Sequence, residues 1–324
     1  MKQFTRVCLI ICGVLAALGL MFCIVGACLG FGVPQIIAMA RDGAFTVHWG
    51  DNDVDLSLWD TPGGTQEPPE GTDEDWSHET KTFSGADVRK LDIEFDFGTL
   101  RIEPSESGDI EVEMNYRSIW GTYSRKVGCG LDGGALKIRD TVQKPILRLF
   151  THDTKDAVLT VRIPADVSFE AVNMDVGGAY VSVGTVLSGE KMDISIGAGE
   201  MVNTADGTAA LQADSINLEI GAGHMSLNGL EARKLDVECG AGQMELRNVT
   251  AQNIDAECGL GQLTMVVNGE EKEYNYEVDC GIGRVAVGSF EYSGLGNSKE
   301  INNGGSRNMS IDCGIGEVIV TFEK

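Results

Sequence analysis

Four of the nine cysteines recur in one pattern and are the residues whose spacing could carry chemistry. Each stands directly before a Gly-x-Gly element, at intervals of 19, 22 and 33 residues. These intervals do not fit the closely spaced ligand pairs of zinc sites, and parallel side chains suit a disulfide poorly. Two earlier copies hold isoleucine in the same slot, so we predict apolar packing. The predicted core column comprises Ile196, Ile220, Cys239, Cys258, Cys280 and Cys313.

Acidic residues form two further columns, one and three positions before the core column. Both columns point outward from the same face of a strand, where directly opposed like charges destabilise a sheet. Two interpretations stay open. One is a solvated face that keeps the domain soluble, and the other is a ladder of Ca²⁺ ions held by paired carboxylates. The candidate metal ligands are Glu219, Asp236, Glu238, Asp255, Glu257, Glu277, Asp279 and Asp312.

Residues for catalysis or for a bound cofactor are not grouped in the sequence. The four histidines share no motif, and His224 occupies an outward slot. Each Gly-x-Gly element is followed by a second strand pattern, whereas a phosphate-binding loop feeds a helix. Acidic columns could serve a β-solenoid lyase or hydrolase, but only Arg284 and loop Lys or Arg residues could act as its base. We therefore predict a protein that is not an enzyme and has no catalytic or cofactor-binding residues.

The elements that position these columns follow from a repeat. LDVECGAGQMEL from Leu235 begins again as IDAECGLGQ from Ile254. Related units start at Met192, Ile216, Tyr276 and Met309. Apolar and polar residues alternate within each unit, which is typical of strands buried on one face. A unit of about 20 residues cannot close its own core, but stacked copies can. We predict an all-β fold, a single-chain β-solenoid whose coils turn at the glycines.

Composition and charge divide the chain. The balance of 25 Lys and Arg against 49 Asp and Glu, a net charge of -24, excludes nucleic acid as a partner. Residues 1–6 are a short basic tail, and residues 7–37 are apolar enough for one transmembrane helix. A cleaved signal or a lipidated segment remain the alternatives. Residues 38–81 are predicted to be an acidic, disordered linker, and residues 82–324 the β-solenoid. The basic tail places the N-terminus in the cytoplasm and the bulk of the chain outside the membrane.

Three stretches of the folded part depart from the repeat. The pattern is weak between Arg117 and Asp156, where only Ala135–Arg139 is a clear strand and Cys129 has no assigned role. The 33-residue interval before Cys313 contains Ser293–Asn308, which is rich in glycine, serine and asparagine. We predict that this insertion is a surface loop. The final strand is then expected to close the stack, with no sorting tail after it.

The basic start with one span, TFSGADVRKLDI from Thr82, the LRIEP and VRIP strands and the glycine coils together resemble a bacterial β-strand-repeat family. Its members carry the adhesin label. The resemblance implies a membrane-anchored β-solenoid displayed outside the cell, without catalytic residues. We expect a surface-binding, adhesin-like module whose partners are envelope polymers or another membrane protein. The alternative is an accessory of an envelope-stress signalling system that acts through a partner membrane helix.

Overall fold

The computed structural model describes residues 45–49, 52–56, 76–117, 119–120, 123–143, 157–203 and 210–323. The chain divides into two compact units, Met1–Glu67 and Pro68–Lys324. The predicted membrane span over residues 7–37 and the tail over residues 1–6 lie outside the described residues. No helix within the described ranges is long and apolar enough to cross a membrane.

The first unit contains a small hairpin, in which β1 (Phe45–Trp49) pairs antiparallel with β2 (Asn52–Leu56). These residues fall in the stretch predicted to be a disordered linker, so that prediction is corrected here. Phe45, Val47 and Trp49 alternate with polar residues, which is the local pattern of a strand. The acidity of the surrounding stretch hid this short alternation.

The second unit also begins earlier than predicted. Strand β3 (Trp76–Ser84) pairs antiparallel with β5 (Asp109–Arg117), so the folded domain starts six residues before Thr82. Most of β3 is exposed or half-buried, and its order comes from pairing with β5, together with the Arg117 guanidinium over the Trp76 ring at 5.9 Å. A strand held by a partner 25 to 41 residues away has no strong local pattern.

Strands β3 to β18 of the described residues form one hydrogen-bonded sheet system, and the all-β prediction is confirmed. At its start, a short 3₁₀ turn η1 (Gly85–Asp87) leads into β4 (Lys90–Pro104). One part of β4 pairs parallel with β8 (Ala135–Gln143) and another with β9 (Ala157–Ile163), and β4 also pairs parallel with β10 (Ser168–Val183). The remaining strands here are β6 (Ile119–Trp120) and β7 (Tyr123–Asp132).

The weakly patterned region after Arg117 thus holds an antiparallel hairpin of β7 and β8. Cys129 lies on β7, opposite Ile138 and half-buried. The Lys81 ammonium donates a hydrogen bond of 3.2 Å to the Cys129 carbonyl oxygen, which ties β3 to this hairpin. Burial raises the pKa of the Cys129 thiol, so it is not an activated nucleophile.

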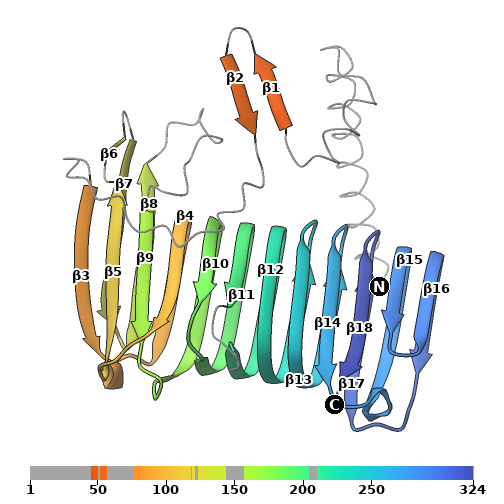
Figure 1. Ribbon diagram of the computed structural model, residues 1–324. Helices are drawn as coiled ribbons and strands as arrows, with labels where there is room; N and C mark the ends of the chain where they lie inside the picture. Colours follow the sequence, from red (N-terminus) through yellow and green to blue (C-terminus); the bar gives the residue numbers. More distant parts are fainter. Residues whose placement is uncertain are drawn as a thin grey trace. The chain divides into compact units, whose positions relative to one another are not determined.

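The repeat units are parallel coils stacked in register, as predicted. The strands are β10 (Ser168–Val183), β11 (Leu187–Asn203), β12 (Leu211–Cys239), β13 (Gln243–Cys258) and β14 (Gln262–Asn268). Strands β10 and β11 each run through one glycine corner. Strand β13 runs from the end of one corner to the start of the corner in the next coil. Strand β12 is the longest because it does both. Figure 1 shows these coils side by side. Their inward residues form one continuous hydrophobic core.

The last two coils are stacked in the reverse of their order in the chain. Strand β17 (Arg307–Cys313) lies between β13 and β15 (Tyr274–Val287), parallel to both. Strand β18 (Glu317–Glu323) likewise lies between β14 and β15, as Figure 1 shows. The prediction that the final strand closes the stack is therefore wrong. The chain forms the coil of β15 one position further along the stack, and β17 and β18 then fill the position between that coil and the coil of β13 and β14.

The position at the end of the stack belongs to β16 (Phe290–Ile301), which follows β15 and pairs antiparallel with it. The segment Ser293–Asn308, predicted to be a loop, therefore contributes most of an edge strand. The charged residues Glu291, Lys299 and Glu300 of β16 are exposed. Charged side chains on an edge strand are a common way to prevent further strand pairing. A 3₁₀ turn, η3 (Glu271–Glu273), precedes β15.

Candidate functional site

The predicted core column is buried, and its four thiols occupy consecutive coils. In space the order is Cys239, Cys258, Cys313 and Cys280, because the last two coils are exchanged. All four side chains are buried free thiols. The thiol of Cys258 has a strongly raised pKa because it is close to Cys239 and is buried. The same contact acts in the opposite direction on Cys239, whose pKa is lowered by it. All four cysteines lie in the hydrophobic core and pack there.

An open depression of about 480 Å³ lies on the outer face of the last coils, over β12, β13, β17, β15 and β16. Its floor is apolar and buried, formed by Ile254, Met309 and Tyr276, which are register partners in three adjacent strands. The remaining lining is mostly polar and partly exposed. The other lining residues are Lys234, Asp236, Asn253, Asp255, Asn275, Glu277, Glu300, Ile301, Asn302, Asn308 and Ser310.

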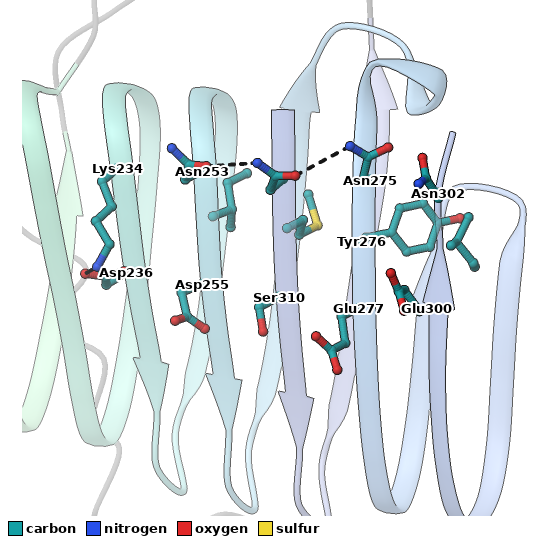
Figure 2. Close-up of a pocket in the computed structure, with 14 residues that line it drawn as sticks. Lys234, Asp236, Asn253, Asp255, Asn275, Tyr276, Glu277, Glu300, Asn302 and Ser310 are labelled. Atoms are coloured by element: carbon teal, nitrogen blue, oxygen red, sulfur yellow. Dashed lines mark hydrogen bonds and ion pairs between the residues drawn. The ribbon is translucent and has the colours of Figure 1, made fainter. Parts of the chain in front are cut away.

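Asparagines line one side of the depression as a ladder. Asn253, Asn308 and Asn275 are register partners in β13, β17 and β15. The Asn308 side-chain NH₂ donates to the Asn253 oxygen at 3.3 Å, and the Asn275 NH₂ donates to the Asn308 oxygen at 3.5 Å. Figure 2 shows this row with its dashed bonds. Asn253 and Asn308 keep further donor and acceptor capacity for a ligand. Asn275 is already fully engaged, because its NH₂ also donates to the Gly305 carbonyl oxygen at 2.9 Å and its oxygen accepts from the Asn303 and Gly305 N–H groups at 3.1 Å.

Sequence reasoning missed this ladder, although a signal was present. Each of the three asparagines stands five positions before a cysteine of the core column. The corresponding slot before Cys239 holds Lys234, which begins the row beside Asn253.

The acidic column three positions before the core column, called the inner acidic column from here on, supplies the second row. In register order it contains Asp236, Asp255, Ser310, Glu277 and Glu300, and Figure 2 shows these side chains below the asparagines. The Lys234 ammonium binds Oδ2 of Asp236 at 2.6 Å, while Oδ1 of Asp236 has no hydrogen-bond partner among the described residues. Ser310 interrupts the carboxylates at the coil that is inserted out of chain order.

The structure thus brings Asp236, Asp255 and Glu277 together in the depression. Glu219, Glu238, Glu257, Asp312 and Asp279 form the separate outer column, nearer the glycine corners. Within the described ranges, no group of three or more His, Cys, Asp or Glu residues is arranged to hold a metal ion.

Tyr276 is fixed at the floor of the depression. Its hydroxyl donates a hydrogen bond of 2.8 Å to a Glu271 oxygen. Burial raises the pKa of Tyr276, and the bond to Glu271 raises it further, so the phenol stays protonated. A phenol held in this way supports the floor and has no role as a base.

The strand segments that follow the glycine corners carry a solvated ladder that includes His224. His224 is the register partner of Gln243, and its Nδ1 lies 3.6 Å from a Glu200 oxygen. The Gln243 amide bonds Gln262 at 3.1 Å, and the Arg284 guanidinium binds Glu317 at 2.8 Å. The outward position predicted for His224 is therefore confirmed, and it is not near the depression. His78, the other histidine with a described side chain, lies 2.6 Å from the Asn115 side-chain oxygen.

Comparison with known proteins gives one family match and several structural matches. The family model described as Toastrack DUF4097 matches residues 88–293, from just before β4 into β16. No curated protein matches the chain. A "putative adhesin" from Bacteroides fragilis is 12% identical, with a TM-score of 0.39 over 78% of this chain and 98% of its own. A "putative cell adhesion protein" from Clostridium sporogenes is 12% identical, with a TM-score of 0.36 over 76% and 100%.

Proposed function

We propose, since the chain belongs to the Toastrack DUF4097 family, that it is a non-catalytic, adhesin-like surface-binding module. The module is a β-solenoid held at the cell membrane by the apolar segment over residues 7–37, with the folded coils outside the cell. The observation that supports binding is the depression, where a row of amides and a row of carboxylates run side by side across successive strands.

The two rows favour a polymer with many hydroxyl groups as the ligand. A carboxylate accepts hydrogen bonds from hydroxyls, and an asparagine both donates and accepts them. An asparagine stands two residues before a carboxylate at Asn253/Asp255 and at Asn275/Glu277, and the coil between them offers Asn308 and the Ser310 hydroxyl. Neighbouring coils repeat these groups about every 4.8 Å. A repeating ligand can use such a surface through many weak contacts.

The charge of the depression limits the range of suitable ligands further. Asp255, Glu277 and Glu300 have no ion pair within the described residues, and Lys234 is engaged by Asp236. An anionic polymer would therefore be repelled, and a neutral or amine-bearing polysaccharide of the cell envelope fits better.

Retention of the purified full chain on polysaccharides tests this function. The probes are isolated peptidoglycan, chitosan as an amine-bearing polymer, dextran as a neutral one and polygalacturonate as an anionic one. We expect retention on one or more of the first three and none on the last. The Asp255→Asn/Glu277→Gln variant should lose retention, while Glu106→Gln, which changes an exposed carboxylate elsewhere, should keep it.

No retention on any polymer, or equal retention by both variants, would contradict the proposed binding surface. Because all three substitutions are at partly or fully exposed positions, matched melting curves should show that the variants remain folded.

The location outside the membrane has its own test. Lys2 and Arg6 precede an uncharged stretch, which supports a cytoplasmic N-terminus. Protease added to intact protoplasts should then remove the domain that starts at Trp76. Survival of the domain until the cells are lysed would show the opposite orientation.

A second candidate function is that of an accessory in an envelope-stress signalling system. Exposed aliphatic side chains at one corner of the stack support a protein partner. If signalling passes through a partner membrane helix, replacing residues 7–37 by an unrelated span should abolish the stress response and leave the protein in the membrane. An intact response after this replacement would remove the candidate.

A further inference from the structure

Three large aliphatic side chains form an exposed row, the corner ridge, at the glycine corners of the last coils. Leu260, Ile315 and Ile282 are 65%, 58% and 53% exposed. They occupy adjacent coils, because the Ile315 N–H donates to Gly259 and the Ile282 N–H donates to Gly314, each at 2.7 Å. The ridge therefore runs along the direction of stacking, in the order Leu260, Ile315, Ile282.

The corner itself does not require a large side chain. The corresponding positions in preceding coils hold Ala198, Ala222 and Ala241, and all three are exposed. Within the described residues the only other large hydrophobic side chain with comparable exposure is Leu131, which is 41% exposed. Clustered exposed aliphatic residues, unlike single ones, are typical of interaction surfaces.

A row of carboxylates accompanies the ridge coil by coil. Glu257, Asp312 and Asp279 stand three positions before Leu260, Ile315 and Ile282, and Glu238 extends the row by one coil. This row has no Lys or Arg partner among the described residues.

Only some of the neighbouring carboxylates are neutralised by a basic side chain. Asp236 is neutralised by Lys234 at 2.6 Å, and Glu317 by Arg284 at 2.8 Å. Burial raises the pKa of Glu257, and the adjacent carboxylates, Asp312 among them, raise it further. The ridge therefore has uncompensated negative charge along one side.

We propose that the corner ridge and its carboxylate row form the docking site for an amphipathic basic helix of a partner protein. The helix would place aliphatic side chains against Leu260, Ile315 and Ile282 and Lys or Arg side chains against Glu257, Asp312 and Asp279. This site goes beyond polymer binding at the depression and is separate from it, since no ridge residue lines the depression.

The spacing selects a helix over other occupants. Coils repeat about every 4.8 Å, close to the helical rise of about 5.4 Å per turn. Anchors at i, i+4 and i+7 therefore follow three coils, as in other helix-docking surfaces. An extended strand repeats its side chains about every 6.7 Å and falls out of step within two coils. A second copy of this chain, with net charge -24, would oppose carboxylates to carboxylates.

The test measures binding of the full chain to a labelled helical peptide by fluorescence anisotropy. The peptide carries Leu at positions i, i+4 and i+7 and Lys at the flanking positions on one side. One control peptide has Glu in place of Lys, and the other has Ser in place of Leu. We expect the first peptide to bind and both controls to bind about tenfold more weakly or not at all.

Variants of the protein locate the contact. Leu260→Ser/Ile315→Ser should weaken binding about tenfold. Glu257→Gln/Asp312→Asn should weaken it and reduce its dependence on salt. Leu131→Ser is the matched control for an exposed aliphatic residue and should change nothing. All of these variants should keep wild-type retention on polysaccharide, which separates this site from the depression.

Several outcomes would overturn the proposal. They are equal binding of the three peptides, unchanged binding by the ridge variants, and stronger association with phosphatidylcholine vesicles than with the peptide. Self-association that is lost in Leu260→Ser/Ile315→Ser would show a second copy as the occupant and would equally overturn it.

Discussion

The thiol of Cys239 lies directly against Gly261 of the next coil. A Cβ on Gly261 would come within 2.9 Å of Cys239 Sγ and would also overlap the carbonyl oxygen of Gly242. Gly316 has the same relationship to Cys258 Sγ, also at 2.9 Å. Gly261 and Gly316 are not in the left-handed region. The second glycine of each of these corners is therefore needed for the close approach of coils and not for an unusual φ.

This relationship predicts a large cost for Gly261→Ala. Overpacking costs about 1–3 kcal/mol, and the upper end applies because rigid backbone must move as well as the thiol. Urea unfolding of the full chain measures it. Gly130→Ala is the control, since a Cβ at Gly130 meets no atom within 4 Å. Equal stability of the two variants would show that the corners do not pack this closely.

Acidification should relieve repulsion in the outer carboxylate column. Burial raises the pKa of both Glu257 and Asp312, and neighbouring carboxylates add to it. The folded state is penalised in full at a pH above these raised values. The penalty disappears as the pH falls through them toward the ordinary carboxyl pKa, so this pair favours folding more at lower pH.

The variant Glu257→Gln/Asp312→Asn isolates that contribution. It should be more stable than wild type at pH 7, and the difference should shrink as the pH falls toward 4.5, the ordinary pKa of a glutamate. Groups with lowered pKa, such as Glu113, which accepts a hydrogen bond from Asn115, act in the opposite direction and are common to both proteins. A difference that is constant with pH would refute the assignment.

Calcium should not raise the melting midpoint at matched ionic strength. The described residues hold no cluster of three or more metal-binding side chains, and Ser310 interrupts the inner column. Melting curves in calcium and in chelator measure this. A rise in calcium that is lost in Glu238→Gln/Glu257→Gln would support a bridging ion on the outer column instead.

The repeats could be predicted from the sequence because one coil is a local unit. Alternating strands and the glycine pair lie within about 20 residues, and in-register stacking follows from identical neighbours. The buried column and the outward acidic columns followed from that register. The asparagine ladder could have been derived from the same register, but it was missed. Asn253, Asn275 and Asn308 show no pattern until their common position, five residues before a cysteine of the core column, is compared.

The order of the last coils could not be predicted in this way. YEVDCGIG in β15 and MSIDCGIG in β17 are nearly the same unit, so either could stack on β13. The choice depends on the antiparallel pairing of β16 with β15, which places β15 at the end. Glycine, serine and asparagine in β16 gave a loop pattern, and its pairing is a tertiary effect. The early strand β3 was missed for the same reason.

Crosslinking tests the exchanged order. Thr264 of β14 is the register partner of Ile319 in β18, which in turn is the partner of Ala286 in β15. With all cysteines outside the core column replaced by serine, Thr264→Cys/Ile319→Cys should react with a short bifunctional thiol reagent. Thr264→Cys/Ala286→Cys should not, because a coil lies between them. The reverse result would restore stacking in chain order.

Hydrogen exchange with a bound polysaccharide tests the central claim, that stacking creates one binding surface from distant segments. The full chain is compared alone and with the polymer that retains it most strongly. We predict slower exchange in three segments together, 253–255, 308–310 and 275–277, and none in the opposite ladder around His224. Protection confined to other segments, or no protection by any retained polymer, would contradict the account.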